Sequence, residues 1–148
     1  MNTPLLIVIA VLVAFSAFFS SAETAFSSLN KVRLKSSETD ENKKKIEKTL
    51  VLAENYDMVL STILIGNNIV NIAASSIATL FFTGVLGDNS DLAATVSTIV
   101  MTVVVLIFGE ITPKTMAKER AEKFAVFVTP AIRFFVFVLA DYSGTRGH

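Results

Sequence analysis

Three asparagines lie within five residues inside a long apolar stretch of the chain. Asn67, Asn68 and Asn71 interrupt a run that extends from Met58 to Phe82. A side-chain amide is costly to bury in hydrocarbon without a partner, so these residues need a structural or chemical purpose there. Asn67 and Asn71 share one face of a helix, whereas Asn68 lies about 100° away around the axis. We therefore expect a polar site on the first face and a packing contact at Asn68.

Two other apolar stretches also carry oxygen-bearing side chains. In the first stretch Ser16, Ser20, Glu23 and Ser27 recur at spacings of four, three and four, which places them on one helix face. In the third, Glu110 lies at the end of the apolar run. Serines and asparagines in such segments also serve as packing residues and interhelical hydrogen-bond partners, which is the plainer interpretation of each one alone. Their gathering in three segments favours a shared site.

A proline near Glu110 adds a backbone ligand to this set. Pro113 has no N–H, so in a continuous helix the carbonyl of Gly109 loses its donor. Hydroxyl, amide, carbonyl and carboxylate oxygens, with no sulfur or imidazole in the apolar stretches, suit hard cations such as Mg2+ or Ca2+. A single carboxylate does not neutralise a divalent cation. The pattern therefore favours a transport site, from which the ion is released, over a permanent structural site.

The composition of the chain indicates an integral membrane protein. Of the 148 residues, 52% are hydrophobic and 18% are charged, and the 13 basic and 13 acidic side chains balance. A balanced charge gives no indication of a nucleic-acid partner. The chain has no cysteine, no phosphate-binding loop and no recognisable pairing of a nucleophile with a base, so we do not expect an enzyme.

Three segments, at about 4–27, 58–83 and 92–112, are long and apolar enough to span a bilayer. Basic residues follow the first and third segments, whereas the loop 84–91 has acidic residues and no basic residue. We expect a multi-pass protein of the inner (plasma) membrane, and the positive-inside rule places its N-terminus outside. A cleaved signal peptide is the alternative for the first segment, because 20–22 could serve as a small-residue cleavage site.

The remaining segments are expected at the cytoplasmic surface. The charged stretch 31–57 predicts a juxtamembrane helix or helical hairpin, with a lipid-recognition patch as the less favoured interpretation. The stretch 114–140 is ambiguous in its second part. Residues 124–140 could form a fourth span or an interfacial helix, because Pro130 and Arg133 interrupt an otherwise apolar run. The final residues, 142–148, form a polar tail outside the domain.

Three short motifs together resemble one known family. They are F-F-S-S-A-E-T-A at Phe18–Ala25, I-G-N-N-I-V-N at Ile65–Asn71 and G-E-I-T-P-K at Gly109–Lys114. Each is weak alone, but in this order and in these positions they resemble the CorC and cyclin M (CNNM) magnesium transporters over nearly the whole chain. The resemblance implies an all-α membrane protein, a homodimer with three transmembrane helices and a cytoplasmic belt of juxtamembrane helices per subunit, with 124–140 in that belt.

The resemblance also implies a function and a ligand set. A dehydrated Mg2+ would be bound between the three helices by Ser20, Asn67, Asn71, Glu110 and the carbonyl of Gly109. The positions that match the motifs with less defined roles are Glu23, Asn68 and Pro113. Mg2+ efflux, with Na+ as the proposed coupling ion, would be the activity. Full-length relatives carry a paired cystathionine-β-synthase-type nucleotide-binding module, which is absent from this chain.

Two other hypotheses remain open on the sequence. The chain could be a Mg2+-binding membrane scaffold or sensor that regulates another transporter, because a binding site has the same residues in either case. A passive channel ranks lower, since the chain has no filter-like run.

Overall fold

The computed structural model describes residues 3–87 and 90–143, and these residues form helices joined by short turns. In chain order the helices are α1 (Thr3–Ser28), α2 (Lys31–Ser36), α3 (Lys43–Glu54), α4 (Tyr56–Leu86), α5 (Ser90–Val104), the π-helix η1 (Val105–Ile111), α6 (Thr112–Glu119) and α7 (Ala121–Ser143). No strand occurs in the described ranges, so the expected all-α class is confirmed.

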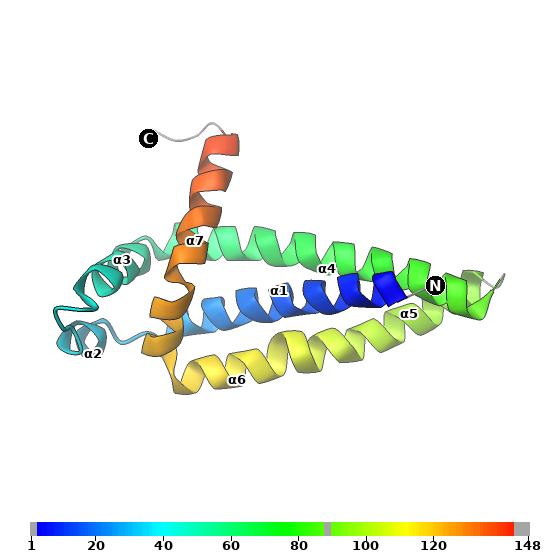
Figure 1. Cartoon of the computed structure of the whole chain (residues 1–148), viewed down its shortest axis with the longest axis horizontal. Coiled ribbons are helices and arrows are strands. Elements are labelled where there is room, and N and C mark those ends of the chain that lie inside the picture. Colours follow the sequence, from blue (N-terminus) through cyan, green and yellow to red (C-terminus); the bar gives the residue numbers. More distant parts are fainter. Residues whose placement is uncertain (1–2, 88–89, 144–148) are drawn as a thin grey trace.

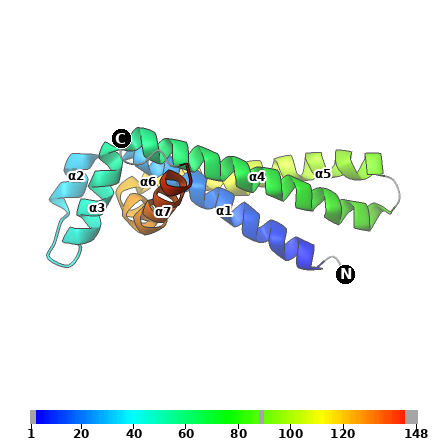
Figure 2. The same cartoon turned by 90° about the horizontal axis from the view of Figure 1, so that it is seen from above.

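Three long helical rods run side by side along the molecule (Figure 1). They are α1, α4 and the continuous rod formed by α5, η1 and α6, and within the described residues these three are long and apolar enough to cross a membrane. The predicted number of spans is thus confirmed. α1 packs against α4 on one side and against η1 and α6 on the other. Its first turns diverge from α4 and α5 (Figure 2).

Small residues allow the rods to pack closely at the centre of the molecule. Ala22 and Ala25 of α1 are fully buried in a cluster that includes Phe19 and, from α4, Val59 and Ile63. Without a strong hydrophobic drive between helices in lipid, such close contact supplies most of the packing energy. The C-terminal half of α1 is therefore held firmly between its two neighbours.

The last helix crosses the rods instead of running beside them (Figure 1). α7 packs against α1, α3 and α4, and it buries Ala125, Val128 and Ile132 in the central cluster. Pro130 lies inside the helix without ending it. The ambiguous stretch 124–140 therefore belongs to one crossing helix of 23 residues.

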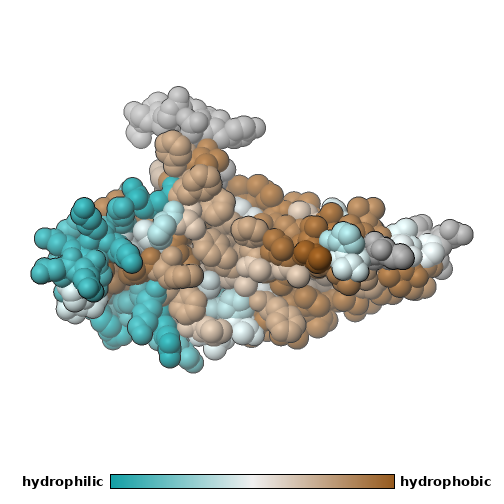
Figure 3. Space-filling view, viewed as in Figure 1, coloured by the Kyte–Doolittle hydropathy of each residue, from teal (hydrophilic) through white to brown (hydrophobic). Residues whose placement is uncertain are grey.

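The charged end of the molecule is built from α2 and α3. Asn30 begins α2 by accepting a hydrogen bond from the backbone N–H of Arg33 at 2.9 Å. The stretch 31–57 thus forms two helices and the start of α4, in agreement with the expected helical hairpin. α3 is fastened to α7 by a buried hydrogen bond of 2.8 Å between the hydroxyls of Thr49 and Thr129. Figure 3 shows hydrophilic residues gathered at this end and an apolar surface over much of the remaining face.

Candidate cation site

A carboxylate of the third rod meets a hydroxyl of the first at the centre of the bundle. Ser20 is fully buried on α1, and its Oγ donates a hydrogen bond of 2.9 Å to Oε1 of Glu110 on η1. The two residues are separated by 90 positions in the sequence. A charge-assisted hydrogen bond of this kind fixes the orientation of the carboxylate. Two of the predicted ligands are therefore in direct contact.

Asn71 of α4 supplies an oxygen that has no partner. Its Oδ1 is buried and accepts no hydrogen bond. Among the described residues, no other buried side-chain oxygen or nitrogen lacks a hydrogen-bond partner. Native proteins seldom leave a buried polar atom unsatisfied, because the desolvation of that atom costs about 1–3 kcal/mol. An atom in this condition is a place where a ligand is expected. Asn71 also lines a cavity together with Glu110.

The second predicted asparagine belongs to a junction of all three rods. Oδ1 of Asn67 accepts a hydrogen bond of 3.2 Å from Oγ of Ser16 on α1. Gly109 of η1 lies on the other side of Ser16, where a Cβ at position 109 would be only 2.9 Å from the same hydroxyl oxygen. Only glycine permits this approach without displacement. Ser16, which sequence reasoning favoured as a packing residue, therefore links α4 to η1.

The helix around Glu110 has an irregular hydrogen-bond ladder. Residues Val105–Ile111 are π-helical, and the N–H of Thr112 donates to the carbonyl of Ile107, five residues earlier. α6 then resumes the α-helical ladder at Thr112. The residue five positions before Pro113 is Phe108, and the residue four positions before it is Gly109. Pro113, which has no backbone N–H, thus lies where the hydrogen-bond pattern changes from π-helical to α-helical. Segments of π-helix are often found at functional sites.

The cavity beside Asn71 and Glu110 has a wall of hydroxyl groups. Its volume is about 320 Å3, and it lies between α4 and the α5–η1 rod. From Asn71 to Thr79 the lining extends eight residues along α4, which corresponds to about 12 Å. The hydroxyl-bearing lining residues are Ser75, Thr79, Ser97, Thr98 and Thr102. None of these was among the expected ligands. The available signals were the spacing of four between Asn71 and Ser75 on α4 and between Thr98 and Thr102 on α5.

The other predicted positions lie around this centre. Asn68 is exposed on α4 and its side chain forms no hydrogen bond within the described residues, so the packing contact expected there is not seen within this chain. Glu23 is half-buried on α1, three residues beyond Ser20. Pro113 is half-buried in the first turn of α6. The structure thus joins Ser20 to Glu110 by a hydrogen bond, places Asn71 and Glu110 on one cavity, and connects Asn67 to Gly109 through Ser16. Within the described residues no group of three acidic, histidine or cysteine side chains could hold a metal ion, so a cation here would depend on the single carboxylate of Glu110 together with neutral oxygens.

Comparison with known proteins gives the family. Residues 7–142 match the model of the cyclin M transmembrane N-terminal domain. The chain is 43% identical over 125 residues to a UPF0053 protein of Haemophilus influenzae, covering 83% of this chain and 28% of that protein. It is 40% identical over 112 residues to the UPF0053 inner membrane protein YfjD of Escherichia coli, covering 74% of this chain and 25% of that protein.

A plant relative is also similar. A DUF21 domain-containing chloroplastic protein of Arabidopsis thaliana is 35% identical over 133 residues, covering 90% of this chain and 20% of that protein. The chain thus spans between a fifth and about three tenths of the length of these curated relatives. The match of the family model covers all three motifs that carried the resemblance. On these grounds the chain belongs to the cyclin M transmembrane N-terminal domain family.

Proposed function

We propose that this membrane domain transports Mg2+, binding the ion at the centre formed by α1, α4 and η1. The observation that carries the proposal is the unpartnered Oδ1 of Asn71, which lines the same cavity as the carboxylate of Glu110. A cation entering the cavity would satisfy that oxygen and bring a charge opposite to that of Glu110. Mg2+ prefers oxygen ligands of these kinds and keeps some of its water.

The hydrogen bonds already present at the centre are compatible with ligation. A hydroxyl oxygen has two lone pairs, so Ser20 can keep donating its proton to Glu110 while it offers an oxygen lone pair to an ion. The amide oxygen of Asn67 accepts one hydrogen bond from Ser16 and retains a second lone pair. These hydrogen bonds therefore orient the oxygens and leave each of them a lone pair for an ion.

The same proposal includes the arrangement of the protein in its membrane. The hydrophilic end with α2 and α3 faces the cytoplasm, the N-terminus lies outside, and two subunits associate in the inner (plasma) membrane. The juxtamembrane helices α2, α3 and α7 form the cytoplasmic belt of this dimer. The direction of transport is export, with Na+ as the coupling ion, and a nucleotide-binding module attached in longer relatives regulates it.

The direct test is Mg2+ flux in proteoliposomes that contain the purified chain. Glu110→Gln and Asn71→Ala should each abolish most of the flux, because they remove the charge and the unpartnered oxygen. Matched controls are Glu119→Gln, at an exposed carboxylate of α6, and Asn68→Ala, at the exposed neighbour on α4. Unaltered flux in both site variants would overturn the proposal. An inward Na+ gradient should accelerate export if the coupling is as proposed.

The same preparation distinguishes transport from a scaffold or sensor role. A scaffold would gain thermal stability from Mg2+ and lose that gain in Glu110→Gln, yet it would move no ion across the bilayer in the absence of a partner. Flux that saturates with Mg2+ but does not need a Na+ gradient would support the transport of Mg2+ and contradict only the proposed coupling to Na+.

A further inference from the structure

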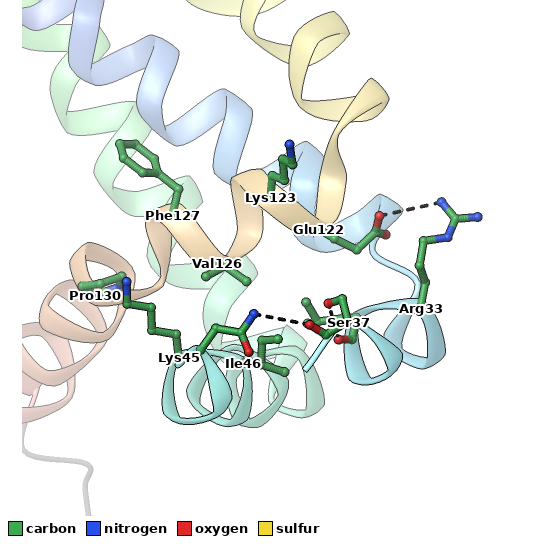
Figure 4. Close-up of a pocket in the computed structure, with 11 residues that line it drawn as sticks. Arg33, Ser37, Lys45, Ile46, Glu122, Lys123, Val126, Phe127 and Pro130 are labelled. Carbon is green, nitrogen blue, oxygen red and sulfur yellow. Dashed lines mark hydrogen bonds and ion pairs between the residues drawn. The ribbon is translucent and has the colours of Figure 1, made fainter. Parts of the chain in front are cut away.

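A second cavity lies far from the cation site, at the charged end of the molecule. It has a volume of about 670 Å3 and is bounded by α2, α3 and the first half of α7 (Figure 4). Its floor is apolar: Leu34 and Ile46 are only 2% and 1% exposed, and Val126 and Pro130 of α7 complete it. Sites for small molecules and cofactors commonly have volumes in this range and apolar linings.

The rim of this cavity is basic. Arg33, Lys45 and Lys123 line it together with one carboxylate, that of Glu122. Arg33 forms an ion pair of 3.7 Å with Glu122, which Figure 4 shows turned toward it. In the part of the chain that the structure describes, Lys45 and Lys123 have no acidic partner. Two positive charges beside an apolar floor are therefore left uncompensated, which favours an anionic ligand.

The apolar lining continues out of the cavity along α7. Phe127 lines the cavity and is 78% exposed, and Phe134 and Phe137 are also exposed. Spacings of seven and three residues place these three rings on one helix face. Phe134 and Phe137 lie beyond the cavity on α7, which extends across the rods (Figure 1), so this apolar face continues from the basic rim along the helix. A ligand that fits both parts has an anionic head and an apolar tail.

We propose that this cavity binds an anionic phospholipid, with its headgroup at the basic rim and an acyl chain along the phenylalanine face of α7. The side chains of Lys45 and Lys123 point in different directions in Figure 4, and each would turn toward the headgroup from its own side of the rim. Basic pockets on the cytoplasmic side of membrane helices are suited to such headgroups. A free phosphate would contact the rim but would leave the apolar floor and the phenylalanines without a partner. The bound lipid would fill the space between α3 and α7, which are otherwise joined near it by the Thr49–Thr129 hydrogen bond.

The test compares the binding of phosphatidylglycerol and phosphatidylcholine to the purified chain in detergent by native mass spectrometry. Lys45→Gln combined with Lys123→Gln should weaken phosphatidylglycerol binding roughly 30-fold, from roughly fivefold for each charge. The matched control is Lys44→Gln combined with Lys118→Gln, which removes two exposed charges from α3 and α6 outside the cavity. It should weaken binding less than twofold. Equal loss in the two double variants would overturn the proposal, since diffuse attraction would then explain the binding.

A second comparison tests the apolar part of the ligand. Glycerophosphoglycerol, the headgroup without acyl chains, and inorganic phosphate should compete with phosphatidylglycerol at least 100-fold more weakly than the lipid itself. Phe127→Ser, at a position that is 78% exposed, should weaken the binding of the lipid and leave the weak binding of phosphate unchanged. Competition by the soluble headgroup as strong as by the lipid, or equal binding of phosphatidylcholine, would contradict the proposal. None of these results depends on whether the chain transports Mg2+.

Discussion

Replacing Asn71 with leucine should make the ion-free protein more stable. The Oδ1 atom of Asn71 is buried without a hydrogen-bond partner, and its desolvation opposes folding by about 1–3 kcal/mol. Leucine has nearly the same shape and no polar atom, so it relieves that cost. For a chain of this length, about 2 kcal/mol corresponds to a rise of about 4–8 °C in the Tm. The measurement is the thermal unfolding of purified protein in detergent with a chelator present.

The same substitution should remove the response to Mg2+. At a Mg2+ concentration 100 times the Kd, a ligand that binds only the folded state adds about 2.7 kcal/mol. The native chain should therefore gain more from saturating Mg2+ than Asn71→Leu gains from the loss of the amide. The order of the two Tm values should reverse between chelator and saturating Mg2+. Such a reversal would not arise from a general improvement in packing.

Asn68→Leu is the matched control, because Asn68 is the exposed neighbour on the same helix. It should keep the full Mg2+ response. The reasoning is refuted if Asn71→Leu has a lower Tm than the native chain in chelator, since the unpartnered oxygen would then have no cost. It is equally refuted if Asn71→Leu retains the native rise in Tm with Mg2+.

Three further predictions concern contacts between helices. Gly66→Ala should lower the free energy of unfolding by about 1–3 kcal/mol, because the added Cβ would lie 2.6 Å from the ring of Phe19. Thermal unfolding measures the loss, and an unchanged Tm would show that the ring moves freely. Thr49→Val should cost about 1 kcal/mol by leaving the buried hydroxyl of Thr129 with one partner fewer, and changing both threonines to valine should recover part of that loss in a double-mutant cycle. Arg33→Gln should change the Tm by the equivalent of less than about 1 kcal/mol, because the arginine side chain is 72% exposed; a larger loss would mean that its ion pair holds α2 against α7.

The fold was largely predictable because its strongest signals are local. Apolar length alone located the three spans, and the helices end within a few residues of the expected bounds apart from the third, which continues through Pro113 into α6. The division of 31–57 into α2 and α3 agrees with the helical hairpin expected there, but the position of the turn at 37–42 was not predicted, since this turn has no glycine or proline to mark it. The crossing of α7 depends on contacts with distant helices, which periodicity does not report.

The candidate site was predictable in its residue types and less so in its contacts. Asn71 and Glu110 were conspicuous because an amide and a carboxylate are costly in an apolar segment. Ser16 was not, because serine is an ordinary packing residue in membrane helices, and its role follows only from the approach of Gly109. The hydroxyl wall on α5 was missed for the same reason. The π-helical ladder of η1 has no compositional mark beyond the nearby Gly109 and Pro113.

The π-helix has a consequence for the angular position of the carboxylate. A π-segment holds one residue more than the α-helical ladder would place in the same turns, and one residue corresponds to about 100° around a helix axis. Glu110 lies inside this segment, between the cavity-lining part of α5 and the regular turns of α6. The direction in which Glu110 points around the rod, relative to Asn71, therefore depends on this one extra residue. Deleting a residue just before the π-helix, such as Val104, would remove this extra residue. The deletion would rotate α5 relative to Glu110 without altering any proposed ligand.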